Sequence, residues 1–283
     1  MERRAADVDG MSPGVDGDAG WYLYGITLGG TNPVAHGALA RGVFGGGPIE
    51  LARTGDLAAV VQRVPLAAID AATADQDVGW LEEMARRHHD VIAAIHRERA
   101  ILPAKFGSIY ATIDDLTQAL VDQHDALRGQ LERVAGHDEW GVRVYVDGGL
   151  LRARAVEVDP TLRELEHSAA DATPGRAYLL RRKLADERLD ADERAARDLA
   201  AGVYDRLAAH AAAGLLGPRR RTEPGPAREA EVLRAAFLVR RADSGDFIAA
   251  FQAATAERAG LRGEYSGPWP PYSFAGHSEE VSA

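Results

Sequence analysis

The spacing of apolar residues changes several times along this chain, and that change limits the possible folds more than any other feature. Across residues 80–100 apolar side chains recur at steps of three and four, which is the stripe of an amphipathic helix. The positions of this stripe are Leu81, Met84, His88, Ile92 and Ile95. Pro103 cannot extend the helix, because it lacks an N–H group and its ring clashes with the preceding turn. We therefore expect residues 101–110 to be an extended strand.

Other segments show short apolar runs or strict alternation, as strands do. Strands are predicted at 21–26, 49–52, 57–61, 140–147 and 231–241, and helices at 112–136, 246–260 and in the long region after 147. Gly55-Asp56 between the second and third strands is typical of a β-hairpin. Thr112 with Asp115 three positions later indicates a capped helix start, and Pro174 interrupts the long helical region.

This order of elements predicts an α+β protein with two domains, each a small, mainly antiparallel sheet covered on one face by helices in a ferredoxin-like arrangement. The expected boundaries are a disordered leader at 1–19, an N-terminal domain at 20–137, a C-terminal domain at 138–277 and a disordered tail at 278–283. The C-terminal domain would contain the long helical region and end in an extended segment rich in proline and aromatic residues. No repeat between the two halves is evident.

Composition excludes several classes of function. The chain has no cysteine among its 283 residues, so disulfides, thiolate nucleophiles and cysteine-based metal centres are excluded. A net charge of −10 argues against binding that depends on broad phosphate neutralisation. No apolar run approaches the roughly 18 residues of a membrane span, and residues 1–20 lack the apolar core of a secretory signal. We expect a cytoplasmic protein, and the preference for arginine over lysine indicates a GC-rich bacterial genome.

A search for catalytic, cofactor and metal sites finds no candidate. His88, His89 and His96 share a predicted helix, but their spacing does not place two imidazoles on one ion. His88 belongs to the apolar stripe and is expected in the core, whereas His89 and His96 lie seven apart on one face, where they could contact a partner. Glycines at 42–47 lack the P-loop ending, and no serine lies in a nucleophile elbow. We therefore expect no enzyme, no cofactor and no metal.

Charged clusters have a simple structural interpretation and a functional alternative. Carboxylate pairs such as Glu82-Glu83 are expected on solvated helix faces. Basic runs occur at 176–183 and 219–221. Each run is either a solvated surface or a docking patch for an acidic partner.

One segment resembles a known family. Residues 100–110, with Pro103, Lys105, Phe106 and Gly107, follow the helix that contains His89 and are similar to a signature strand of the GvpF/GvpL family of gas vesicle proteins. Lys105 and Ser108 stand where the family usually has Arg and Thr. Five further segments are similar to the same family in the same order: 22–26, 55–61, 139–144, 175–179 and 267–274.

The resemblance implies a bacterial gas vesicle protein, of actinobacterial type, that is associated with the vesicle in the cytoplasm. It also implies contacts with the small hydrophobic shell protein GvpA and with other vesicle proteins, without enzymatic activity and without nucleic acid or membrane partners. The residues of the matching motifs are candidate partner contacts: His89, Pro103, Lys105, Phe106, Gly107, Trp140, Arg176, Tyr178, Pro268, Trp269, Pro271, Tyr272 and Phe274.

Two of these motifs also have structural interpretations. Phe106 is expected in the core and Gly107 at a bend. The rings of the closing segment either form a surface for the shell protein or pack back on the domain as a clasp, and we favour the clasp.

Two other classes of function stay open at this stage. A ferredoxin-like small-ligand-binding regulator or enzyme would need a polar pocket with convergent titratable groups. An RNA-binding protein would need exposed aromatic residues interleaved with arginine on adjacent strands, and Tyr145 beside Arg143 is the only hint of such a face.

Overall fold

The computed structural model describes residues 19–30, 42–43, 47–66, 78–218, 229–257 and 260–276. Most of the expected leader, the tail at 278–283 and the basic run at 219–221 therefore lie outside the described residues. The chain divides into two compact units. Unit 1 comprises residues 1–139 together with 268–283, and unit 2 comprises residues 140–267. The expected boundary near 138 is close to this division, but the closing segment groups with unit 1, whereas it was expected in the C-terminal domain.

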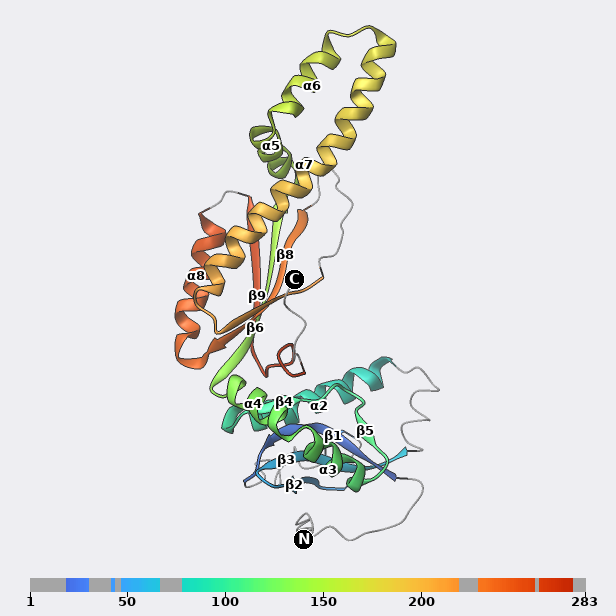
Figure 1. Ribbon diagram of the computed structural model, residues 1–283, viewed down its shortest axis with the longest axis vertical. Helices are drawn as coiled ribbons and strands as arrows, with labels where there is room; N and C mark the ends of the chain where they lie inside the picture. Colours follow the sequence, from blue (N-terminus) through green and yellow to red (C-terminus); the bar gives the residue numbers. More distant parts are fainter. Residues whose placement is uncertain are drawn as a thin grey trace. The chain divides into compact units, whose positions relative to one another are not determined.

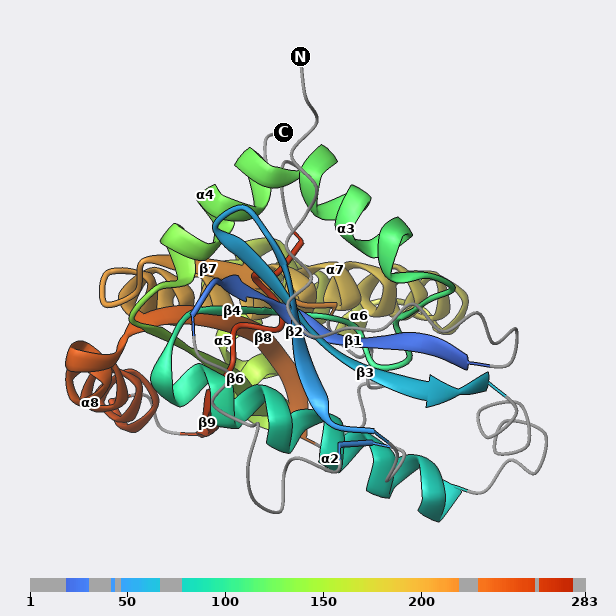
Figure 2. The same cartoon turned by 90° about the horizontal axis from the view of Figure 1, so that it is seen from below.

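Unit 1 contains a five-stranded sheet with helices on both of its faces (Figures 1 and 2). Its strands are β1 (Ala19–Leu28), β2 (Ile49–Thr54), β3 (Leu57–Pro65), β4 (Ile101–Pro103) and β5 (Ile109–Tyr110). Their order is β2-β3-β1-β4, with β5 also paired to β1. The β1–β3, β2–β3, β1–β4 and β1–β5 pairs are all antiparallel.

The two faces of this sheet pack against different helices. Helix α2 (Val78–Glu98) covers the face that carries Tyr22 and Tyr24, and α3 (Ile113–Asp122) with α4 (His124–Val134) covers the face that carries Leu23. Consecutive residues of β3 are therefore all buried from Leu57 to Gln62, in place of the alternation of a half-exposed strand. The expectation that helices cover only one face is wrong for unit 1, because the sequence contains a second apolar helical stripe after residue 112.

Two expected elements of unit 1 are interrupted. The predicted strand at 101–110 is divided into β4 and β5 by a turn in which Gly107 has a φ of +86°. The predicted helix at 112–136 breaks at Gln123, which ends α3 and precedes α4. The start of α3 is confirmed as predicted, since the Thr112 side chain accepts a hydrogen bond from the Asp115 amide at 3.1 Å.

Unit 2 contains a four-stranded sheet of order β7-β8-β6-β9. The strands are β6 (His137–Asp147), β7 (Ala213–Leu216), β8 (Glu229–Arg240) and β9 (Leu261–Trp269), and β7 pairs antiparallel with β8. The helices are α5 (Gly148–Val158), α6 (Pro160–Ala170), α7 (Pro174–Ala208) and α8 (Ser244–Ala256), with a 3₁₀ turn η2 (Arg241–Asp243) before α8. β6 and β9 continue past the boundary, so their ends at 137–139 and 268–269 belong to unit 1.

The core of unit 2 forms where α7 and α8 pack on one face of its sheet. Val142, Val144 and Val146 of β6 alternate toward this core, as predicted, while Arg143 points away from it and is exposed. The sheets and helices confirm the predicted α+β class with two antiparallel sheets. The ferredoxin-like arrangement stays a prediction.

Candidate functional site

The first part of the site is a buried polar cluster under the turn between β4 and β5. His88 is 4% exposed, and its two ring nitrogens contact the Tyr22 hydroxyl at 2.9 Å and the Ala104 carbonyl at 3.2 Å. A carbonyl can only accept a hydrogen bond, so in the neutral imidazole Nε2 donates to Ala104 and Nδ1 accepts from Tyr22. Burial lowers the pKa of His88 to about 4, which keeps the ring neutral. The prediction that His88 is a hydrogen-bonded core residue is confirmed.

The same cluster supports Phe106 at the surface. The Gly107 amide donates a hydrogen bond to the Tyr22 hydroxyl at 3.3 Å, which ties the turn to β1. The Phe106 ring lies edge-on to His88, with the ring centres 5.7 Å apart. Its side chain is nevertheless 41% exposed, so the prediction that Phe106 is a core residue is wrong. The reason is that Tyr22 and His88 already fill the space beneath the turn, and the ring rests on top of them.

The second part of the site joins His89 to the closing segment, both within unit 1. His89 Nδ1 lies 2.8 Å from the Tyr272 hydroxyl, and the His89 ring lies edge-on to Trp269 with centres 5.3 Å apart. The pKa of Tyr272 is raised, first by burial and then by the nearby Glu139 carboxyl. His89 is therefore a contact within the chain rather than a free partner ligand. The closing segment packs on α2 through His89, as the clasp interpretation predicts, but the rings of Trp269 and Tyr272 stay partly exposed, so the clasp does not exclude a partner surface.

A buried carboxyl fixes the end of this segment. Glu139 accepts hydrogen bonds from both the amide and the hydroxyl of Ser273, each at 2.7 Å. Burial raises the pKa of Glu139, and the two Ser273 hydrogen bonds oppose that rise. Arg133 donates to the Phe274 carbonyl at 3.2 Å, and the Phe274 ring is 3% exposed. Backbone and side-chain contacts together therefore hold residues 272–274 in one position.

His96 was expected on a partner-contact face with His89, but the structure places it elsewhere. Its side chain is buried, and Nε2 lies 2.7 Å from the Asp138 carboxylate. The suggestion that His89 and His96 form a shared partner-contact face is therefore wrong for His96. The two residues are seven positions apart on α2, but the strand that begins at His137 covers one of them.

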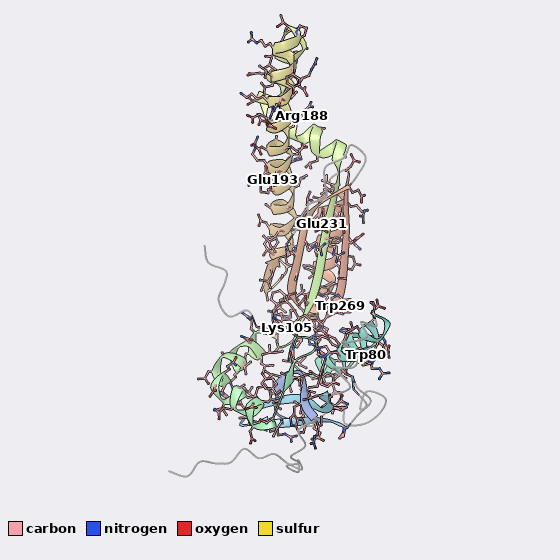
Figure 3. The ribbon with its side chains drawn as sticks, turned by 90° about the vertical axis from the view of Figure 1, so that its right-hand side faces the viewer. Trp80, Lys105, Arg188, Glu193, Glu231 and Trp269 are labelled. Carbon is pink, nitrogen blue, oxygen red and sulfur yellow. The ribbon has the colours of Figure 1, made fainter. Side chains whose placement is uncertain are left out.

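Among the residues of unit 1 that the structure describes, three aromatic side chains stay at the surface after these contacts are made. Trp269 is 40% exposed and Tyr272 is 36% exposed, and both lie against His89, while Phe106 lies against His88. We call Phe106, Trp269 and Tyr272 together the aromatic surface, which has two parts: Phe106 on His88, and Trp269 with Tyr272 on His89. Lys105, next to Phe106, is also exposed, and Figure 3 labels both Lys105 and Trp269.

The remaining predicted residues lie elsewhere or serve the core. Trp140 is 5% exposed in the core of unit 2, where its ring packs against Phe247 and Tyr265. Arg176 and Tyr178 lie on α7 and are exposed. The others occupy structural positions in unit 1: Pro103 ends β4, Gly107 forms the turn, Pro268 begins the closing segment, and Pro271 is buried beneath it.

Sequence reasoning missed the acceptor Glu139 and its partner Ser273. A usable signal existed, since Asp138-Glu139 is an acidic pair that directly precedes an alternating apolar strand. An acid at the start of a strand that enters the core is expected to need a hydrogen-bond donor.

The structure gives little support to a metal site or to the small-ligand-binding class that the sequence left open. Across the described ranges, no cluster of three or more His, Asp or Glu side chains could hold a metal ion. A cavity of about 330 Å³ in unit 2 is lined by Arg143, Arg234, Glu264 and Ser266, among others. Its cationic side chains are partly neutralised, because Arg234 is paired with Glu231 at 2.7 Å.

The possible nucleic-acid face of unit 2 is also neutralised. Arg262 lies over the Tyr145 ring, 4.2 Å from its centre, so an arginine and an aromatic ring do meet on adjacent strands. The guanidinium is bound to Glu229 and Glu264, however. A phosphate would have to displace these carboxylates, which argues against the RNA-binding class.

In the parts that the structure describes, no helix is long and apolar enough to span a bilayer.

Comparison with known proteins gives a consistent result. A sequence model described as "Gas vesicle synthesis protein GvpL/GvpF" matches residues 20–276. Gas vesicle protein L of a Streptomyces species is 35% identical over 262 residues, covering 92% of this chain and 94% of that protein. Gas vesicle protein F of the same species is 28% identical over 263 residues, covering 89% of this chain and 98% of that protein.

Solved structures show the same fold. The crystal structure of gas vesicle protein GvpF from an Anabaena species aligns with a TM-score of 0.66 at 18% identity, covering 92% of this chain and all of that one. The GvpF structure from Microcystis aeruginosa aligns with a TM-score of 0.60, also at 18% identity, covering 90% of this chain and 98% of that one.

Proposed function

This chain belongs to the gas vesicle synthesis protein GvpL/GvpF family, and from that membership we propose that it binds the shell protein GvpA during vesicle assembly. In this account the chain is an accessory or minor structural component that does not catalyse a reaction. The observation that carries the proposal is the aromatic surface, three large rings that stay 36–41% exposed on a firmly held part of unit 1.

The shell protein is the partner that best fits such a surface. A small hydrophobic subunit exposes apolar area and unpaired strand edges before it assembles, and both features cause aggregation. A partner with exposed rings can cover that area until the subunit reaches the growing shell. Tyr, Trp and Phe are enriched at protein interfaces because each ring covers a large apolar area.

The contacts beneath the rings support a binding role over a purely structural one. Tyr272 is held by His89, and Ser273 is held by the buried carboxyl of Glu139. Trp269 therefore stays in place without burying its own ring. A surface whose side chains are ordered before binding loses less entropy when the partner arrives.

The proposal is tested by co-purification of the full chain with separately tagged GvpA. Truncation of a hot-spot residue weakens an interface by about 2 kcal/mol or more, so we expect Trp269→Ala and Phe106→Ala each to weaken binding by roughly thirtyfold or more. Val121→Ala is the matched control, because Val121 is an apolar residue of unit 1 that is 53% exposed on α3 outside the aromatic surface.

Each variant should first show the circular dichroism of the unmodified chain. Weaker binding by the two aromatic variants, with the control unchanged, supports the proposal. Absence of binding by the unmodified chain, or equal loss in all three variants, would contradict it.

A further inference from the structure

We propose that the tip of the α6–α7 hairpin is a second docking surface, which binds an acidic, amphipathic segment of a partner protein. α7 has 35 residues, which at 1.5 Å per residue gives a length of about 50 Å. Its C-terminal half contributes Leu199, Val203 and Leu207 to the core of unit 2. Its N-terminal half runs beyond the sheet beside α5 and α6, as Figures 1 and 3 show.

The basic residues at the tip differ from those nearer the sheet. Arg188 and Arg194 of α7 pair with Glu166 and Asp159, and these ion pairs hold the hairpin together. Residues 172–185 lie between Asp171 on one side and Asp186-Glu187 on the other, and they contain no acidic residue and four exposed basic ones: Arg176, Arg181, Arg182 and Lys183. Within the described parts of the chain, none of these four forms an ion pair. The tip therefore carries four cations that are not held in ion pairs, on a chain whose net charge is −10.

Two large apolar side chains lie among these cations. Tyr178 is 65% exposed and Leu179 is 66% exposed. Neither is needed to hold the hairpin, because Ala177 and Leu184 are the buried residues of this part of α7. On a helix, Tyr178 neighbours Arg182 and Leu179 neighbours Lys183, each pair four positions apart. The tip thus combines apolar area with adjacent positive charge.

The composition of the tip favours a protein partner over nucleic acid or a lipid surface. Arg and Tyr are enriched at protein interfaces, and at the tip Tyr178 lies four positions from Arg182. The acidic remainder of the chain would be repelled by a long polyanion or an anionic leaflet. A partner segment needs only local complementarity, with carboxylates opposite the cations and apolar side chains opposite Tyr178 and Leu179.

The test uses the full chain and a synthetic helical peptide with a leucine stripe flanked by glutamates, followed by fluorescence anisotropy. The same peptide with lysine in place of glutamate is the probe control. We expect binding of the glutamate peptide that weakens as salt is added. The double variants Arg181→Glu/Arg182→Glu and Tyr178→Ser/Leu179→Ser should each bind at least about tenfold more weakly.

The matched control is Arg197→Glu/Arg240→Glu, which makes the same change in net charge at exposed positions away from the tip. It should bind the glutamate peptide as the unmodified chain does. Equal weakening in this control, or binding of the lysine peptide, would overturn the proposal. So would tip-dependent sedimentation with phosphatidylserine vesicles in the absence of peptide binding, which would indicate a membrane surface.

Crosslinking and compensating charge substitutions in vesicle-producing cells identify and test the natural partner. An apolar photoreactive residue in place of Leu179 should crosslink to an acidic segment of another vesicle protein. Lysine substitutions in that segment should restore binding to Arg181→Glu/Arg182→Glu. Failure of the compensating substitutions would overturn the proposal. These variants leave the aromatic surface intact, so this result and the GvpA result can fail independently.

Discussion

Adjacent residues of α2 have different roles because they point toward different parts of unit 1. His88 points into the sheet, where Tyr22 and Ala104 satisfy both nitrogens and burial keeps the ring uncharged. His89 points toward the closing segment and supports Tyr272 and Trp269. Together the two histidines support all three rings of the aromatic surface. Two titratable groups around this surface, His88 and Glu139, give predictions of opposite sign.

Acidification should destabilise the chain through His88. The pKa of this side chain falls from 6.5 to about 4 on folding, so between those values the unfolded chain binds a proton that the folded chain does not. The stabilising contribution of the uncharged His88 ring is therefore complete above pH 6.5 and is lost as the pH falls toward 4, by up to about 3 kcal/mol. The free energy of unfolding of His88→Gln should differ from that of the unmodified chain at neutral pH, but it should not show this loss on acidification. Urea unfolding at neutral and acidic pH measures both free energies of unfolding. The same loss of stability in the two proteins would contradict the prediction.

A rise in pH should act on Glu139 in the opposite direction. The pKa of this carboxyl is raised above its ordinary value of 4.5, so the folded chain retains a proton that the unfolded chain releases. The stabilising contribution of protonated Glu139 is present below pH 4.5 and is lost as the pH rises through the pKa of Glu139 in the folded chain. Glu139→Gln should have a flatter pH profile than the unmodified chain, measured by urea unfolding between about pH 5 and pH 8. The exposed control Glu98→Gln should follow the unmodified chain.

At the scale of elements, apolar periodicity predicted the helices and strands that depend on local sequence. It failed where a segment distant in sequence packs against them. α2, the start of α3 and the alternation of β6 follow from apolar spacing and capping chemistry. The position of Phe106 did not follow, because Tyr22 comes from a strand far away in sequence and fills the space below it. The closing segment was placed in the wrong half for the same reason. Ser273 finds its acceptor 134 residues earlier, and no local pattern encodes that distance.

The turn between β4 and β5 offers a test of this positioning. Gly107 has a φ of +86°, yet a Cβ added there would meet no atom within 4 Å. Gly107→Ala should therefore cost only backbone strain, about 1–2 kcal/mol. Gly129→Ala is the matched control, since Gly129 also has open space but lies inside α4. That control should stabilise the chain by about 0.5–1 kcal/mol, measured by urea unfolding. Equal effects of the two substitutions would contradict the assignment.

At the scale of the molecule, each unit contributes a different kind of surface. Unit 1 presents three ordered, partly exposed rings, which suit an apolar shell subunit. Unit 2 presents a cationic hairpin tip, which suits an acidic partner. A chain that engages both partners at once would hold them near each other, and linked binding of this kind raises the effective concentration of the second partner. The account therefore predicts a protein that connects vesicle components.

The most direct test of the central claim is photo-crosslinking in cells that are forming gas vesicles. A photoreactive phenylalanine derivative, which keeps an aromatic ring at the substituted position, replaces Trp269 in one strain and Val121 in another, and the crosslinked peptides are identified by mass spectrometry. The account predicts adducts with the shell protein from position 269 and none from position 121. No shell-protein adduct from position 269, or equal adducts from both positions, would contradict it.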